Sequence, residues 1–208
     1  MKIRITEEKL PQSICLLQPT RPIFCTTKNE DGSDHAAPFS WITAISCKPP
    51  RVAFALQNER GQKLSHTLEN VLREREFVIN MPQMGQEHIL VQASYGLVNH
   101  SCKFDSTGSA REDSLYIKPK MMADCVASIE CKVFATIDTG GDHTLILADI
   151  VSANYEEECY DEMLWPVDSK HKPLINLREY RFDDHQKHIF IDTSKEYEVN
   201  VPYEKKNE

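Results

Sequence analysis

Residues 127–155 limit the possible folds more than any other segment, because they have the pattern of one long β-hairpin. In the first half, apolar side chains alternate with mostly polar ones, at Ala127, Ile129, Cys131, Val133, Ala135 and Ile137. A period of two is typical of a half-buried strand. Thr139-Gly140-Gly141-Asp142 supplies a turn, and residues 144–155 return as an apolar strand. A hairpin alone is only marginally stable, so the sequence predicts an antiparallel sheet with further strands.

Other segments supply those strands, with helices between them. A second hairpin within residues 21–39 turns at Asn29-Glu30-Asp31-Gly32, and residues 51–56 and 77–82 are predicted strands. Residues 63–76 and 83–94 are predicted helices. The apolar face of the first helix comprises Leu64, Leu68, Val71 and Leu72, and its start is capped by Ser65 or Thr67.

Two segments fit neither pattern. Residues 40–50, SWITAISCKPP, are predicted to be an irregular apolar loop at a barrel corner, stopped by Pro49-Pro50. Residues 95–125 are predicted to be a long excursion with one helical turn. Strands and helices do not alternate regularly, so a mainly β fold is favoured, a closed antiparallel barrel with a few crossing helices. The 208 residues are expected to form a single domain, residues 1–208, with a core at about 11–195 and a frayed tail at 202–208.

Charge and composition exclude several classes of function. The formal charge of −8 disfavours nucleic acid and anionic membranes as partners. Neither a signal-peptide core nor an 18-residue apolar run is present in the sequence, so a cytoplasmic location is expected. Seven cysteines without a Cys-x-x-Cys pair indicate reduced, mostly buried thiols rather than a metal site. The histidines His171, His185 and His188 do not have the spacing of metal ligands, so their side chains are expected to be solvated.

The loop that begins at residue 38 also has features of a ligand site. Hydroxyl groups at Ser40, Thr43 and Ser46 lie among the apolar side chains of Phe39, Trp41 and Ile42. This combination suits a flat heteroaromatic ligand whose edge needs hydrogen bonds. The alternative is that the loop only turns a corner of the barrel.

The following helix offers a second polar patch at its start. Helix N-termini carry unpaired N–H groups and a partial positive charge, so they bind phosphate. The residues available there are Lys63, Ser65, His66 and Thr67. The alternative is an ordinary capped helix.

Taken together, these segments resemble a known family. RPIFCTTKNEDGSDHAAPFSWITAISCKPPRVAFAL, HTLENVLREREFVINMP, CKFDSTG and ASIECKVFATIDTGGDHTLIL follow the order and spacing of the flavin reductase-like proteins of the FMN-binding split-barrel fold, especially the flavoredoxin-like branch. The resemblance covers roughly residues 20–155. The family pattern has Asn where this chain has His35, and Lys-Asp-Thr where it has Ser65-His66-Thr67.

The resemblance implies FMN as the cofactor. In the family the flavin lies against the loop that matches Pro38 to Ser46, with Ser40, Trp41 and Ile42 along the isoalloxazine and Ser46 near its polar edge. In the family the FMN phosphate lies against the residues that match His66 and Thr67, and we add Lys63. Cys47, next to Ser46, either tunes the flavin edge or is a small residue of the barrel corner. The cofactor-binding set is therefore Pro38, Phe39, Ser40, Trp41, Ile42, Thr43, Ser46, Cys47, Lys63, Ser65, His66 and Thr67.

The resemblance also bears on assembly and activity. It implies a homodimer with the flavin near the subunit interface, and residues 95–125 would then form an arm over the partner's site. The Gly-Asp-His of the family lies near the flavin, so His143 is the candidate catalytic residue; the alternative is that it is only a turn residue of the hairpin. Three functions stay open: an NAD(P)H-dependent reductase, an FMN electron carrier that serves a redox protein partner, and a flavin-binding module without turnover. The sequence contains no Gly-x-Gly-x-x-Gly, so NAD(P)H would bind transiently over the flavin.

Overall fold

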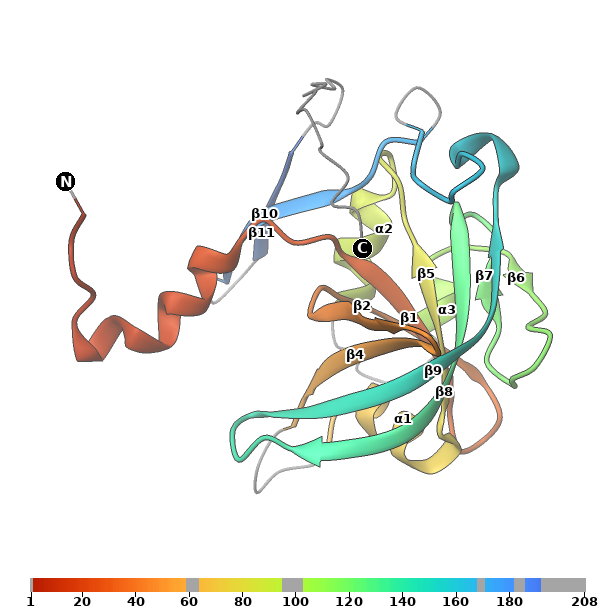
Figure 1. Cartoon of the computed structure of the whole chain (residues 1–208), viewed down its shortest axis with the longest axis horizontal. Coiled ribbons are helices and arrows are strands. Elements are labelled where there is room, and N and C mark those ends of the chain that lie inside the picture. Colours follow the sequence, from red (N-terminus) through yellow and green to blue (C-terminus); the bar gives the residue numbers. More distant parts are fainter. Residues whose placement is uncertain (1, 59–63, 95–102, 168–170, 182–185, 192–208) are drawn as a thin grey trace, which may run out of the picture.

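A computed structural model describes residues 2–58, 64–94, 103–167, 171–181 and 186–191. Its centre is a seven-stranded antiparallel sheet in the order β2-β1-β5-β8-β9-β4-β3 (Figure 1). The strands are β1 (Ile23–Lys28), β2 (Asp34–Phe39), β3 (Ile42–Cys47), β4 (Pro50–Gln57), β5 (Glu76–Met81), β8 (Ala127–Asp138) and β9 (His143–Tyr155). The mainly β fold predicted from the sequence is confirmed.

The connection between β2 and β3 shows that this sheet curls into a barrel. The two strands are its opposite edges, yet only Ser40 and Trp41 separate Phe39 from Ile42. Three peptide units span at most about 11 Å, so the two edges must approach each other closely. The sheet order does not pair β2 with β3. The barrel is therefore split at this seam rather than closed, as the family resemblance predicted and the periodicity argument alone did not.

Both predicted hairpins are present in the sheet. Lys28 pairs with Asp34 across the first turn, and Asp138 pairs with Thr144 across the second. The simple alternation along β8 is interrupted, because bulges fall after Glu130 and after Val133. Beyond them Ile137 is exposed, contrary to its place in the predicted apolar face, and Glu130 is buried.

Residues 42–47 form an edge strand, so the predicted irregular loop was wrong there. β3 pairs with β4 from Ile42↔Phe54 to Cys47↔Pro50, with one bulge between Ala44 and Ser46. Most of its side chains are exposed. An edge strand that carries apolar side chains toward solvent lacks the alternation by which strands are recognised.

The predicted helices are confirmed with shorter bounds. α1 (His66–Glu74) buries Leu68 and Val71, and Leu64 packs against the same cluster, whereas Leu72 is exposed, contrary to prediction. α2 (Glu87–Ser94) follows, and the single helical turn expected in the 95–125 excursion is α3 (Lys103–Ser106). The excursion also contains a short hairpin, β6 (Arg111–Glu112) and β7 (Met121–Met122), while residues 95–102 lie outside the described residues.

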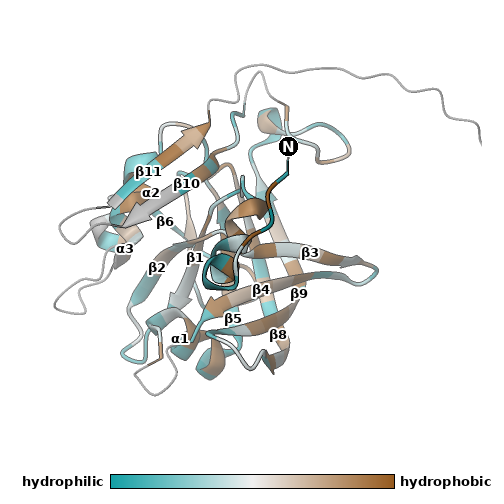
Figure 2. Ribbon diagram, turned by 90° about the vertical axis from the view of Figure 1, so that its left-hand side faces the viewer, coloured by the Kyte–Doolittle hydropathy of each residue, from teal (hydrophilic) through white to brown (hydrophobic). Residues whose placement is uncertain are grey.

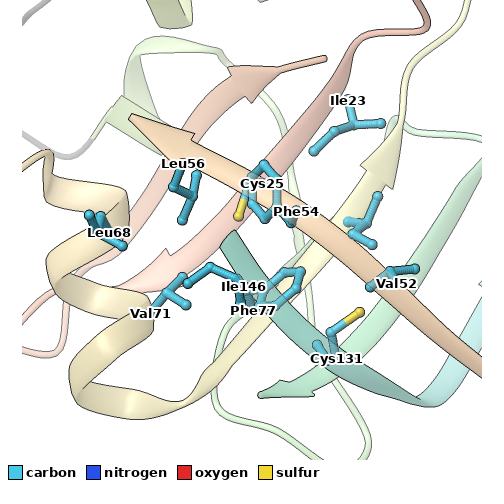
Figure 3. Packing of buried hydrophobic residues seen from close by; sticks show 12 residues of the cluster. Ile23, Cys25, Val52, Phe54, Leu56, Leu68, Val71, Phe77, Cys131 and Ile146 are labelled. Carbon is cyan, nitrogen blue, oxygen red and sulfur yellow. The ribbon is translucent and has the colours of Figure 1, made fainter. Parts of the chain in front are cut away.

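Two apolar clusters hold the sheet and helices together. The first fills the barrel interior beneath α1 and includes Phe54, Leu56, Phe77 and Ile146 (Figure 3). The second lies between β1, β2 and the helices α2 and α3, around Phe24, Ala36, Leu90, Phe104 and Leu174. Leu174 belongs to the second cluster, so the C-terminal segment, residues 171–181 and 186–191, contributes to the core.

That segment forms a separate hairpin next to α2, β10 (Ile175–Arg181) and β11 (Gln186–Ile191) (Figure 1). Thr20 and Asn176 exchange two backbone hydrogen bonds of 3.0 and 2.9 Å. His171 is fully buried, 3.1 Å from the Arg21 guanidinium, so its predicted solvated side chain was wrong. His185 and the tail at 202–208 lie outside the described residues. The start of β1 is thus fastened to the C-terminal segment.

The remaining short elements are η1 (Glu7–Leu17) and η2 (Glu157–Cys159), both 3₁₀-helices. η1 extends away from the barrel and has no buried residue (Figure 1). Figure 2 shows hydrophobic and hydrophilic residues mixed along this element. Leu10, Leu16 and Leu17 are exposed.

The thiols are mostly buried, as predicted. Cys25, Cys125, Cys131 and Cys159 are buried, and only Cys15 and Cys47 are exposed among the described cysteines. Burial raises the pKa of the Cys125 thiol to about 12. Cys102 lies outside the described residues.

Candidate functional site

A cavity of about 450 Å³ lies at the seam between β2 and β3. Its described lining comes from the end of β2, the two linker residues, β4, the start of α1, α2, the first residue of β9 and the C-terminal hairpin. Eight of the predicted site residues line it: Pro38, Phe39, Ser40, Trp41, Ser65, His66, Thr67 and His143. The split in the barrel thus brings together the two patches that sequence analysis found separately.

The other predicted residues that the structure describes, all on β3, do not line the cavity. Ile42 packs against the barrel core, and Thr43, Ser46 and Cys47 lie along β3 with half or fully exposed side chains. A strand advances by about 3.3 Å per residue, so β3 carries them away from the seam. Lys63 lies outside the described residues.

One end of the cavity is the start of α1. Ser65 is the N-cap residue, but its hydroxyl donates to the Gln57 carbonyl oxygen at 3.1 Å and caps no helix N–H, so the predicted side-chain cap is absent. The first hydrogen bond of the helix runs from the Glu69 N–H to the Ser65 carbonyl oxygen. The N–H groups of the first turn, such as those of Thr67 and Leu68, therefore have no acceptor within the helix and give this end a partial positive charge.

A buried pair lies behind this helix start. The Nε2 atom of His35 on β2 is 3.0 Å from Oγ1 of Thr67, and the rings of His35 and His66 make an edge contact with centroids 6.1 Å apart. A hydroxyl has one donor and two acceptor positions. If His35 donates to Thr67, the Thr67 O–H is left to donate to a ligand oxygen. His35 was noted in the sequence only as a departure from the family pattern, and its contact with Thr67 was not predicted.

A stacked aromatic pair forms another side of the cavity. The rings of Trp41 and His143 lie 4.5 Å apart with 25° between their planes. The Nδ1 atom of His143 lies 2.8 Å from the Asp142 carboxylate, and this hydrogen bond lowers the pKa of Asp142. Nδ1 is thereby engaged, which leaves Nε2 to face another partner. His143 is consequently more than a turn residue, because its side chain joins the cavity lining.

Several lining residues were missed by the sequence analysis. They include Pro22 beside β1, Leu90, Ala93 and Ser94 on α2, and Asn176 and His188 on the C-terminal hairpin. Asp183-Asp184 between two strand-like runs was an available hairpin signal. With His188, four of the six histidines that the structure describes line the cavity.

Two negative findings apply to the described residues. Among them, no group of three or more His, Cys, Asp and Glu side chains is arranged to hold a metal ion. No helix in the described parts of the chain has the length and apolar character needed to cross a membrane.

Comparison with known proteins identifies the family to which this chain belongs. Residues 18–179 match the family model described as "Flavin reductase like domain". The chain belongs to the flavin reductase-like family. It is accordingly a flavoprotein of the oxidoreductase class, as the resemblance of its motifs predicted.

Relatives of this flavin reductase-like chain support the assignment. A protein from Kitasatospora aureofaciens named flavin reductase (NADH) is 25% identical over 165 residues, which are 72% of this chain and 78% of the relative. Among solved structures, nitrilotriacetate monooxygenase component B from Bacillus cereus superposes with a TM-score of 0.82 at 17% identity, covering 96% of this chain and 99% of that one. Flavoredoxin of Desulfovibrio vulgaris (Miyazaki F) superposes with a TM-score of 0.72 at 17% identity, covering 96% and 97%. These similarities confirm the split-barrel fold.

Proposed function

We propose that this flavin reductase-like protein binds FMN in the seam cavity and transfers electrons from NAD(P)H to a small acceptor. One observation carries the proposal: the cavity joins the open start of α1 to the aromatic side chains of Phe39 and Trp41. A ligand that fills it needs an anionic end and a flat apolar body. FMN has both.

The residues at each end fit that cofactor. At the start of α1, His66 and Thr67 would hold the phosphate, with the Thr67 hydroxyl oriented by His35. A phosphate monoester carries close to two negative charges, and a chain of net charge −8 can bind it only where positive potential is concentrated. Along the linker, Phe39, Ser40 and Trp41 would hold the ring system.

Bound FMN supplies the electron chemistry, since a flavin accepts a hydride or single electrons in its ring. The protein's contribution is to bind, orient and exclude water. Trp41 and His143 cover one side of the cavity with a stacked pair. Because Asp142 holds Nδ1 of His143 at 2.8 Å, the Nε2 atom is placed to give or take a proton. His143 is therefore the proposed general acid–base residue.

NADH is supported as a donor by the name of the Kitasatospora aureofaciens relative. A second candidate function is electron transfer with a protein partner. Met163, Leu164 and Trp165 protrude with exposed fractions of 76%, 56% and 66%, on a turn whose N–H groups at Met163 and Trp165 donate to Asp161. Exposed tryptophan and methionine are typical of protein interfaces, so this turn favours a docking protein.

A homodimer with the flavin near the interface is part of the proposal. Several apolar side chains on the outer surface are exposed, namely Ile45 on β3 and Phe134 and Ile137 on β8. Covering them in a symmetric dimer would remove apolar surface from water. Light scattering at micromolar concentration should give the mass of two chains; a monomer that retains FMN would contradict this assembly.

The deciding experiment is a flavin titration followed by anaerobic reduction. The purified protein should be yellow, or should change the absorbance of added FMN on binding. NADH or NADPH should then bleach the bound flavin in the absence of oxygen. Protein that binds no flavin would defeat the proposal, whereas binding without bleaching would favour the electron carrier.

A further inference from the structure

The C-terminal hairpin contributes to the cavity, although it lies outside the motifs that resemble the family. Asn176 on β10 and His188 on β11 line it, together with Pro22, Leu90 and Ala93. Asn176 is held in place by its paired backbone hydrogen bonds with Thr20, and the register of β10 shifts just after it. The backbone hydrogen bonds with Thr20 thus fix the position of Asn176 at the cavity.

The side-chain oxygen of Asn176 is an unusual group in this fold. The residue is 9% exposed, and its Oδ1 atom is buried without a hydrogen-bond partner among the described residues. Buried amides are nearly always satisfied, because an unpaired acceptor loses its bond to water. An unpaired acceptor in a cavity-lining residue therefore points to a donor that a ligand supplies.

The chemistry of an amide narrows the class of that ligand. Asn presents an acceptor and a donor side by side in one plane, which matches the N–H and C=O of another amide. The neighbouring Pro22, Leu90 and Ala93 offer an apolar surface for a flat ring. The ligand group is thus an amide or imide edge on a planar heterocycle.

The location of Asn176 relative to the helix start agrees with this. His35 lies behind the start of α1, and Phe39 is four residues further along β2, a distance of about 13 Å in a strand. Phe39 pairs with Ile23 at the start of β1. The residues just before Ile23 include Pro22, which lines the cavity, and Thr20, which pairs with Asn176. Asn176 therefore belongs to the end of the cavity away from the proposed phosphate position.

We propose that Asn176 is a specificity-determining residue that accepts a hydrogen bond from the amide-type N–H of a planar ring ligand in this cavity. Two sources share that chemistry, the imide of the flavin ring and the carboxamide of a nicotinamide stacked on it. The inference rests on the proposed flavin site and assigns the hairpin β10–β11 a role in ligand recognition.

The test compares ligand pairs that differ in this one group. Lumiflavin and 3-methyllumiflavin differ in whether the imide nitrogen carries hydrogen. NAD⁺ and 3-acetylpyridine adenine dinucleotide differ in whether the ring carries a carboxamide, and both are titrated into FMN-loaded protein. Dissociation constants are read from the flavin spectrum, so no turnover is required. The variants are Asn176→Ala and the nearly isosteric Asn176→Leu, with Asn176→Asp to retain an acceptor and Asn154→Ala as an exposed asparagine control.

For one of the two ligand pairs, the ratio of dissociation constants that favours lumiflavin or NAD⁺ should fall by about fivefold in Asn176→Ala and Asn176→Leu, as expected for the loss of one hydrogen bond. The same ratio should be unchanged in Asn176→Asp and Asn154→Ala. The pair that responds identifies the flavin imide or the nicotinamide as the source. Parent-like ratios for both pairs in either folded variant would overturn the assignment of Asn176. A parent protein that binds no flavin at all would instead defeat the proposed function.

Discussion

The Nε2 atom of His35 lies 3.0 Å from the Thr67 hydroxyl, and both side chains are buried. This contact joins the second strand of the first hairpin to the first turn of α1. Thr67 matches the family pattern, whereas His35 departs from it. A histidine in place of asparagine still provides a hydrogen-bonding atom behind the helix start, and it adds the capacity to bind a proton.

Replacing Thr67 should weaken FMN more than riboflavin. Thr67→Ala removes the hydroxyl proposed to donate to the phosphate, and riboflavin has no phosphate. The expected loss for FMN is about 1.5–3 kcal/mol, the value of a charge-assisted hydrogen bond. Fluorescence titration of both ligands measures it, with Thr136→Ala, an exposed threonine on β8, as control. Equal losses for both ligands would place the phosphate elsewhere.

His143→Ala should slow anaerobic reduction of the bound flavin by NADH while leaving FMN affinity nearly unchanged. The expected decrease is about 10²–10⁴-fold, the usual contribution of general acid–base catalysis. Stopped-flow absorbance measures the rate, and His88→Ala, an exposed histidine on α2, is the control. A variant that is reduced at the parent rate would exclude His143 from the reaction and favour the electron carrier.

Glu130 should be important for stability rather than for catalysis. Its buried carboxylate accepts hydrogen bonds from the backbone N–H groups of Leu115 and Tyr116, each at 2.8 Å. These bonds hold the 113–120 loop against β8. In Glu130→Gln one acceptor oxygen becomes an NH₂ group that opposes a donor. The free energy of unfolding should fall by about 1–3 kcal/mol. Urea denaturation measures this, and the exposed Glu112→Gln should leave the midpoint unchanged; equal midpoints for both variants would contradict the role.

Thiol labelling should separate the cysteines by burial. Cys15 and Cys47 should react with a thiol reagent within minutes at neutral pH, because both are exposed. Cys25, Cys125 and Cys131 should react only after unfolding, since burial raises the pKa of each thiol and only the thiolate is nucleophilic. Peptide mass mapping assigns each label. Rapid labelling of Cys131 in the folded protein would show that the barrel interior opens.

The parts of the fold that sequence analysis predicted depend on local patterns. The hairpin of β8 and β9 follows from alternation and a Gly-Gly turn, and α1 follows from the spacing of Leu68 and Val71. These signals lie within a few residues of one another, so they survive without knowledge of the tertiary structure.

The parts that were missed depend on contacts between distant segments. His171 contacts Arg21, and Asn176 pairs with Thr20. Both contacts join the C-terminal segment to the residues before β1, so neither could be predicted from local sequence. Likewise, residues 42–47 were predicted to be an irregular loop because the pairing of β3 with β4 cannot be read from residues 40–50 alone. Tertiary pairing, and not local propensity, decides all three cases.

The pairing of Thr20 with Asn176 sets an order of events during protein synthesis. All twelve buried residues of the barrel-interior cluster lie between Ile23 and Ala148, so that cluster is complete in a nascent chain that has just passed β9. The cavity, in contrast, lacks Asn176 and His188 until the last described strands leave the ribosome. The cavity therefore has its complete described lining only after the C-terminal hairpin has been synthesised, whereas the barrel-interior cluster needs no residue beyond Ala148.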